Sequence, residues 1–512
     1  MSEDAFYITT PLYYTNSTPH IGHAYTTIAA DILARFHRVT GNGRAHFLTG
    51  TDEHGPKVDD AATAANTTAK AFVDEIVERW KAQWRELNIS YDQFIRTTDP
   101  EHERAVQQIL ERLRDQGDVV AGKYEGWYCR NDETFWLERQ LVDGRCPNPE
   151  CGREVEWVSE DAWFFTLSKY RDRLVAYYKE HPDWVRPQRA YNEMLSLLEN
   201  GLEDLCVSRK GVVWGIPFPW DSGVVYVWFD AICNYITAAG YPADARRFER
   251  LWPADVQLIG KEIARFHAVI WPAILMALEL PLPKLVFAHG WITMEGRKMS
   301  KSVGNILRPA ELIERIGLDS TRYVLFAQAP FGSDFSLSEE SVQRRHNAEL
   351  ANDLGNLVQR TLAMLGRYRS GIVGVPTGGE RFGEAFAISR DVVTRAMQQL
   401  DFRSALAEIW KQIGALNLYV EQTKPWELAK REDQAALDAV LYDLCEGLRF
   451  IASFVWPFMP ATAETMWISL GQTGVPGHTW ERTLRWGGLA RGSQTSVPAP
   501  LFPRVEAEGP AA

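Results

Sequence analysis

The chain has 512 residues, of which 46% are hydrophobic and 24% charged, and its formal net charge is −12. This length is too great for a single hydrophobic core, so about three domains are expected. The acidic balance argues against indiscriminate binding of polyanions. Neither a long uncharged apolar run nor a signal-peptide pattern occurs at the start, MSEDAFYITT, so we expect a cytoplasmic protein with no membrane association.

The first segment predicts a strand followed by a helix. Residues 6–14, FYITTPLYY, mix β-branched and aromatic residues, whereas apolar residues recur at helical spacing over 21–36. Thr18 is the expected N-cap, which puts His20 and His23 at a helix N-terminus, where backbone N–H groups attract phosphate. A zinc pair would be spaced i, i+4 with a third ligand near, so phosphate is favoured over metal. Two ordinary helix-start histidines remain the alternative.

Strand and helix patterns divide the rest of the chain. Their alternation predicts an α/β fold with a Rossmann-like parallel sheet, split by an insertion rich in Trp, Pro and Gly and followed by an α-helical bundle. In the bundle one helical face carries Ala405, Ile409, Ile413, Leu416 and Val420. The expected ranges are 1–115 and 223–293 for the sheet domain, 116–222 for the insertion, 294–346 for a segment that carries KMSKS, 347–486 for the helical domain and 487–512 for an irregular tail.

The segment 294–346 contains GRKMSKSVGN, residues 296–305, which places Lys298 and Lys301 between Gly296 and Gly304. Two ammonium groups in a glycine-flanked loop can close on a polyphosphate. Without other evidence, the better explanation for the two lysines would be an ordinary basic turn exposed to solvent. The histidine pair, about 280 residues earlier, is also expected to bind an anion at the end of a strand. The occurrence of two such anion-binding elements in one α/β sheet is hard to explain by chance.

These two elements carry a resemblance to a known family. PHIGH and KMSKS resemble the two signatures of class I aminoacyl-tRNA synthetases, and the chain further resembles methionyl-tRNA synthetases through LTGTDEHG, YVWFDAICNY, LIGKEIARFH, FAHG and KPWELAK. The resemblance covers nearly the whole chain. It implies that methionine and ATP, with Mg²⁺, form an adenylate, and that the methionyl group passes to the terminal adenosine of tRNA(Met), initiator tRNA included.

The resemblance also assigns residues. Those that line the methionine pocket would be Leu12, Tyr14, Asp52, Trp228, Ala231, Ile232, Tyr235 and His267. ATP would contact His20, Gly22, His23, Lys298, Ser300, Lys301 and Ser302, with His20, His23, Lys298 and Lys301 in catalytic roles. The anticodon would meet Asn356, Arg360, Pro425 and Trp426. Without the resemblance, core packing would be the better explanation for the aromatic residues.

The insertion departs from the pattern of bacterial relatives, which often carry four-ligand zinc knuckles. Here Cys129, Cys146 and Cys151 cluster, and Asp132 stands where a second cysteine of the first pair would be. A Cys3Asp zinc site is chemically feasible. A decayed site with three thiols and no metal is the alternative.

Two other functions would share parts of this pattern. A synthetase for isoleucine, valine or leucine would carry a large editing domain, for which residues 116–222 leave no room. A non-catalytic tRNA-binding protein would not be expected to keep both signatures intact. The absence of a C-terminal dimerisation module suggests a monomer.

Overall fold

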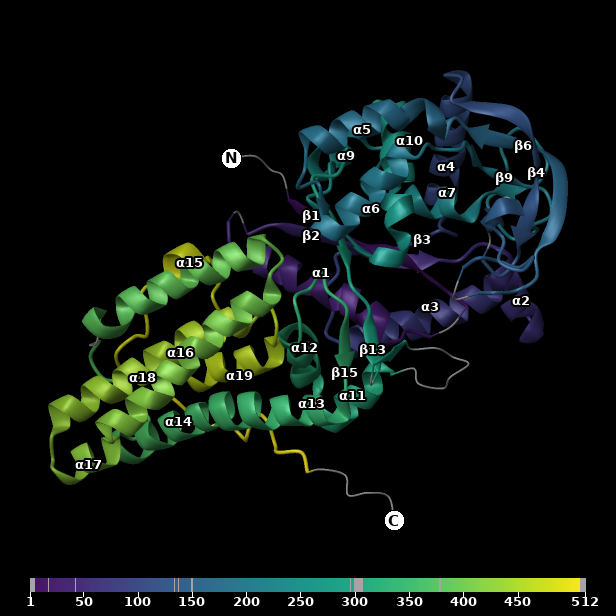
Figure 1. Ribbon diagram of the computed structural model, residues 1–512. Coiled ribbons are helices and arrows are strands. Elements are labelled where there is room, and N and C mark those ends of the chain that lie inside the picture. Colours follow the sequence, from purple (N-terminus) through teal and green to yellow (C-terminus); the bar gives the residue numbers. More distant parts are fainter. Residues whose placement is uncertain are drawn as a thin grey trace, which may run out of the picture. The chain divides into compact units, whose positions relative to one another are not determined.

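The computed structural model describes residues 5–16, 18–41, 43–132, 134–136, 138–148, 151–294, 296–298, 307–376 and 379–506 (Figure 1). The chain forms two compact units. Unit 1 comprises residues 1–18, 46–85 and 91–288; unit 2 comprises residues 19–45, 86–90 and 289–512.

Unit 1 is built on a six-stranded sheet with strand order β3-β2-β1-β11-β12-β7. Its strands are β1 (Phe6–Tyr14), β2 (Ala45–Asp52), β3 (Gln93–Arg96), β7 (Val185–Arg186), β11 (Val256–Gly260) and β12 (Val286–His289). The pairs β1–β11, β2–β3 and β12–β7 are parallel. Every residue of β11 is buried, as a strand covered on both faces of a parallel sheet requires. The Rossmann-like prediction is confirmed.

The segment predicted as an insertion contains a second, antiparallel sheet with strand order β5-β4-β6-β8. Its strands are β4 (Val119–Cys129), β5 (Thr134–Trp136), β6 (Glu156–Phe165) and β8 (Leu205–Cys206). Strands β4 and β6 pair from Val119 opposite Phe165 to Tyr128 opposite Glu156. The same segment also supplies β7, so the insertion contributes an edge strand to the parallel sheet.

The remaining elements of unit 1 are short strands and helices around these sheets. Strands β9 (Ser208–Arg209) and β10 (Val224–Val225) form an antiparallel pair. The helices are α2 (Pro56–Ala64), α3 (Ala69–Glu86), α4 (Pro100–Asp115), α5 (Arg171–Glu180), α6 (Gln188–Glu199), α7 (Val227–Ile232), α8 (Asn234–Thr237), α9 (Ala245–Leu251), α10 (Trp271–Ala277), η1 (Glu138–Gln140), η2 (Leu167–Tyr170), η3 (Lys261–Ile263) and η4 (Phe266–Ile270).

Unit 2 is mostly helical. It holds α1 (Ile21–Val39), α11 (Pro309–Ile316), α12 (Leu318–Ala327), α13 (Glu339–Arg345), η5 (His346–Gly355), α14 (Asn356–Arg369), η6 (Gly379–Gly383), α15 (Glu384–Gln398), α16 (Phe402–Thr423), α17 (Pro425–Lys430), α18 (Gln434–Val455), α19 (Pro460–Ser469) and α20 (Trp480–Thr483). A small sheet joins β14 (Arg297–Lys298), β13 (Ile292–Met294) and β15 (Phe335–Leu337). Helices α14, α15, α16 and α18 pack as a bundle (Figure 1), and the five apolar residues predicted on one face of α16 are all buried.

A buried ionic node lies within unit 2. Asp31 of α1 accepts from Arg35 Nε at 2.8 Å and from Arg322 Nη2 of α12 at 2.6 Å. Arg322 is fully buried and also donates to the carbonyl oxygens of Phe458 at 2.8 Å and Pro457 at 3.1 Å. Each charge therefore has the partners that a buried ion requires. These bonds join α1 to the turn between α18 and α19.

The end of the chain is irregular but bonded. Among residues 487–506 the structure has no helix, and Gln494 forms an isolated bridge with Ile372. Asn347 holds Val505 through two hydrogen bonds, of 2.8 and 3.0 Å, to its backbone. Within the described ranges, every helix is too short or too polar to span a bilayer.

Candidate functional site

The predicted methionine residues lie at strand ends and on short helices of unit 1. Tyr14 ends β1 and Asp52 ends β2, and the two ends are joined because Thr15 N–H donates to the Asp52 carbonyl at 3.1 Å. Leu12, Tyr14 and Trp228 are half-buried against the same hydrophobic core that contains Ile232 and Tyr235. Ala231 is also buried. The structure thus places five of the candidate residues, Leu12, Tyr14, Trp228, Ile232 and Tyr235, around one core.

Tyr235 and His267 are in direct contact. His267 Nδ1 lies 3.0 Å from the Ile263 carbonyl oxygen, so this nitrogen carries the proton, and Nε2 accepts from the Tyr235 hydroxyl at 2.7 Å. Burial lowers the pKa of His267 to about 4 and raises the pKa of Tyr235. Both side chains are therefore uncharged near pH 7, an environment that suits a thioether.

Trp228 has an aromatic partner that the sequence did not identify. Its ring stacks on Phe266 with centroids 4.0 Å apart and an interplanar angle of 9°. Phe266 begins the π-helical turn η4, which also carries His267. Such turns often occur at functional sites. The position of Phe266 next to His267 in GKEIARFH was the available clue.

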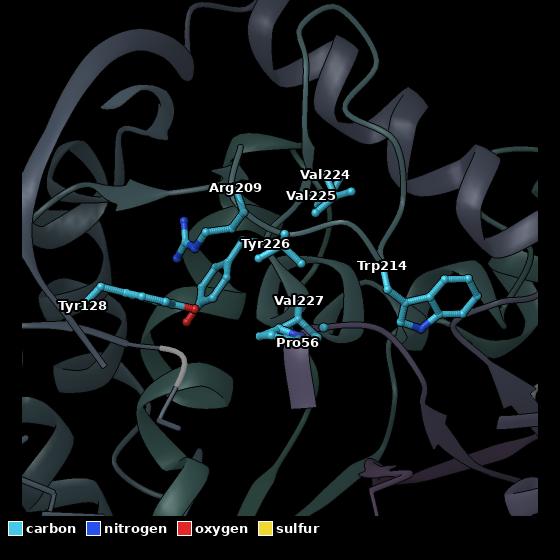
Figure 2. Close-up of a pocket in the computed structure, with 10 residues that line it drawn as sticks. Pro56, Tyr128, Arg209, Trp214, Val224, Val225, Tyr226 and Val227 are labelled. Carbon is cyan, nitrogen blue, oxygen red and sulfur yellow. The ribbon is translucent and has the colours of Figure 1, made fainter. Parts of the chain in front are cut away.

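Arg209, to which no sequence motif pointed, lines a small cavity (Figure 2). Its guanidinium lies 4.0 Å from the centroid of the Tyr226 ring, and Nη1 donates to the Ser208 carbonyl at 2.8 Å. Trp214, on the same cavity, donates from Nε1 to the Glu53 carbonyl at 2.6 Å.

The start of α1 in unit 2 differs from the expected cap. His20 is the N-cap rather than Thr18, because the imidazole takes the role of the usual oxygen acceptor: Nδ1 of His20 accepts from Gly22 N–H at 3.1 Å. In return, His23 Nδ1 accepts from His20 N–H at 3.2 Å. In the neutral rings both protons then sit on Nε2, which makes each Nε2 a donor.

The two imidazoles also stack, with centroids 3.7 Å apart. A Cβ at position 22 would come 2.9 Å from His20 Cε1, so a larger residue there would displace this imidazole. Two Nε2 donors beside the backbone N–H groups of a helix start are suited to phosphate oxygens.

The lysine motif is described only in part. Lys298 ends β14, where its backbone pairs with Thr293. Ser300, Lys301 and Ser302 lie outside the described residues. Their expected contacts with ATP therefore stay predictions.

The three clustered thiols converge. The sulfurs of Cys129, Cys146 and Cys151 lie within 4.8 Å of one another, and that of Cys129 is 3.4 Å from that of Cys151. Asp132 is not part of this mutual group, but its Oδ2 lies 3.8 Å from Cys146 Sγ. Sulfurs bound to one tetrahedral zinc at about 2.3 Å would be spaced similarly.

Backbone N–H groups support these sulfurs. Those of Asp132, Asn148 and Arg153 bond Cys129, Cys146 and Cys151 respectively. Burial raises the pKa of Cys129 and raises that of Cys146 to about 12, whereas at Cys151 the Arg153 N–H and neighbouring side chains outweigh burial and lower the pKa. The donor set and spacing fit zinc, which would deprotonate the thiols.

Two of the predicted anticodon residues, Arg360 and Trp426, meet on the helical bundle of unit 2. Pro425 is buried as the first residue of α17, and Trp426 beside it is half-buried. Arg360 of α14 places its guanidinium 5.9 Å from the centroid of the Trp426 ring and pairs with Glu421 at 2.8 Å. Asn356, one turn before Arg360, is exposed. An indole and a guanidinium on one surface suit unstacked bases.

Comparison with known proteins identifies the class. The parallel sheet with its antiparallel insertion is the fold of a class I tRNA synthetase, and the family model described as tRNA synthetases class I (M) matches residues 6–362. A model of the anticodon binding domain of methionyl tRNA ligase matches residues 375–511. Within its class, the chain belongs to the methionyl-tRNA synthetase family.

Similar proteins include a methionine–tRNA ligase of Caldanaerobacter subterraneus, 50% identical over 510 residues, which span 98% of this chain and 79% of the relative. That of Clostridium acetobutylicum is 47% identical over 98% of this chain and 78% of its own. The Mycobacterium tuberculosis methionyl-tRNA synthetase in complex with methionyl-adenylate is 40% identical, with a TM-score of 0.92, and 98% of this chain and 100% of that chain are covered.

Proposed function

We propose that this enzyme activates L-methionine with ATP to methionyl-adenylate and transfers the methionyl group to the 3′-terminal adenosine of tRNA(Met), for initiation and elongation. The observation that carries the proposal is the neutral Tyr235–His267 pair beside the Trp228–Phe266 stack, in a chain whose family model is that of the methionine enzymes. Polarisable sulfur gains about 0.3 to 1.5 kcal/mol from an aromatic contact.

In the first step, a methionine carboxylate oxygen attacks the α-phosphorus of ATP, and pyrophosphate leaves. The Asp52 carboxylate would hold the substrate ammonium, and Leu12, Ala231 and Ile232 would line its side chain. The Nε2 donors of His20 and His23 would bind phosphate oxygens, with Lys298 and Lys301 on the pyrophosphate side. The protein contributes positioning and charge stabilisation, since the substrates supply both reacting groups.

In the second step, a ribose hydroxyl of the terminal adenosine, which we expect to be the 2′-hydroxyl, attacks the carbonyl carbon of the adenylate, and AMP leaves. In the first step, Mg²⁺ carried by the ATP phosphates would offset negative charge on the departing pyrophosphate. Asn356, Arg360, Pro425 and Trp426 would bind the CAU anticodon by stacking and base-edge contacts.

The thiol cluster supports a zinc ion with a structural role. Cys129, Cys146 and Cys151 would hold it, with Asp132 as the fourth ligand. The metal would tie the end of β4 to Cys146 and Cys151. We further expect a cytoplasmic monomer, and light scattering on the purified full chain tests its mass.

The function is tested by ATP–pyrophosphate exchange with each amino acid separately, followed by charging of tRNA(Met). Exchange that depends on methionine alone is the expected result. Exchange with isoleucine, valine or leucine would indicate a different synthetase, and no exchange at all would indicate a non-catalytic tRNA-binding protein.

A further inference from the structure

A buried carboxylate in unit 1 is shared by two histidines. Asp230 Oδ2 lies 2.7 Å from His54 Nδ1, and Oδ1 lies 2.8 Å from His102 Nε2. The side chains of Asp230 and His102 are 1% exposed and that of His54 is 3% exposed. Carboxylate oxygens only accept, so each of these two nitrogens must carry a proton.

The outer sides of the two imidazoles are also engaged. His102 Nδ1 lies 2.7 Å from Thr237 Oγ1, and His54 Nε2 lies 3.7 Å from Glu103 Oε1. Burial alone would lower the pKa of His54, but the Asp230 carboxylate raises it above its ordinary value. The charge on Asp230 thus has bonded partners on both oxygens, which a buried carboxylate requires.

The three residues come from three elements that surround the amino-acid site. His54 follows two residues after Asp52, at the end of β2. His102 lies in the first turn of α4. Asp230 lies in α7 between Trp228 and Ala231, two of the residues assigned to methionine.

The segment that carries His54 is held from its other side as well. Trp214 packs its ring on His54 with centroids 5.4 Å apart, donates to the Glu53 carbonyl at 2.6 Å, and accepts from Gly55 N–H at 3.0 Å. The segment after β2 therefore has few alternative positions once His54 bonds Asp230. If that bond is lost, the distance between Asp52 and Trp228 is no longer fixed by this link.

We propose that Asp230, through His54 and His102, is a positioning residue of the methionine site, which sets the end of β2 with Asp52 against the helix that carries Trp228 and Ala231. The inference rests on the proposed function. It assigns no step of the reaction to the three residues, since the bonds described join them to one another and to neighbouring protein groups. Their effect is on the geometry in which the amino acid is bound, not on ATP.

The test uses the full chain and a pair of variants at position 54. The amide nitrogen of Asn can replace Nδ1 of His as the donor to Asp230, so His54→Asn keeps the link that His54→Ala removes. We expect His54→Ala to weaken methionine binding, measured by calorimetry, at least tenfold, and His54→Asn to stay within about threefold of wild type. The KM for ATP in pyrophosphate exchange should stay within about twofold in both variants.

Asp230→Asn is compared with Asp118→Asn to separate positioning from general loss of stability. Asp118 is 3% exposed and accepts from Lys169 at 2.7 Å and Tyr170 at 2.8 Å, and it is assigned to no site. We expect Asp230→Asn to weaken methionine binding and Asp118→Asn to leave it unchanged, although both lower the melting temperature. Equal effects of the two variants on methionine binding, or equal effects of His54→Ala and His54→Asn, would overturn the inference.

Calorimetry needs no turnover, so the two proposals can fail separately. If wild type binds methionine but produces no exchange, the proposed function fails and the variants still decide the inference. If wild type activates another amino acid, the function fails and that amino acid becomes the probe. If no amino acid binds, both proposals are overturned.

Discussion

Replacement of Trp426 by Ala should separate the two halves of the reaction. The indole is half-buried at the start of α17 and lies under the Arg360 guanidinium. A base stacked on this ring would contribute about 1 to 3 kcal/mol, which corresponds to roughly 5- to 150-fold in affinity. Methionine activation does not involve the anticodon. We therefore expect aminoacylation kcat/KM to fall at least tenfold, while methionine-dependent pyrophosphate exchange stays within about twofold of wild type.

The cost in stability distinguishes recognition from core packing. A fully buried Trp replaced by Ala typically costs about 3 to 5 kcal/mol, and a half-buried ring should cost roughly half of that. Melting curves are recorded for Trp426→Ala and for Ile468→Ala, a control whose side chain is 68% exposed on another helix of unit 2. The control should leave charging and melting close to wild type.

Anticodon preference is the deciding measurement. Charging is compared for tRNA with CAU and with altered anticodons, using wild type and Trp426→Ala. If the indole recognises the anticodon, the ratio of charging efficiency for CAU to that for altered anticodons should be smaller in Trp426→Ala than in wild type. A variant that melts earlier but discriminates anticodons as wild type does would refute the reasoning, because Trp426 would then be a packing residue.

Three further outcomes are expected. His20→Asn keeps a good N-cap but loses the imidazole, so exchange should slow by about 10²- to 10³-fold with little change in melting; a loss of tenfold or less would remove His20 from phosphate binding. Purified protein should contain close to one zinc per chain, which Cys146→Ala releases; metal-free, fully active protein would establish the decayed site. The pKa of His267 falls from 6.5 to about 4 on folding, so between these pH values the unfolded chain binds more protons than the folded chain. The free energy of unfolding should therefore drop as pH falls through this window, by roughly 3 kcal/mol more in wild type than in His267→Gln. Urea unfolding of wild type and of His267→Gln at pH 7 and at pH 4 measures this. The same loss of unfolding free energy in both proteins would contradict the prediction.

Local patterns predicted the regular elements well. FYITTPLYY forms β1 with the expected bounds, because its β-branched and aromatic residues favour a strand. The apolar face expected on α16 is buried, because it depends on helical periodicity alone. The two-residue strand β7 could not be foreseen, since it exists only through its pairing with β12 about 100 residues later. The cap of α1 was missed for a related reason: ordinary cap preferences favour Thr18, and the imidazole of His20 is an acceptor only in its folded rotamer.

In the candidate site too, motifs predicted residues, whereas the contacts between these residues depend on the fold. The candidate methionine residues were predicted through motifs, and two of them, Tyr235 and His267, are in contact. Their protonation could not be read from the motifs, because it depends on the Ile263 carbonyl and on burial. The bonds of Asp230 to His54 and His102 join positions 176 and 128 residues apart, and no periodicity reports such a contact.

The Arg322 node restricts how this enzyme can be shortened. A fragment that stops at residue 362, where the synthetase family match ends, would lack the Pro457 and Phe458 carbonyls. Two donors of a fully buried guanidinium would then have lost their acceptors, at a cost of about 1 to 3 kcal/mol for each unsatisfied group. Since Arg322 also holds Asp31 of the histidine-bearing helix α1, the damage would reach that helix. Minimal enzymes and split reporters made from this chain should therefore retain the turn at 457–458 or replace Asp31 and Arg322 together with apolar residues.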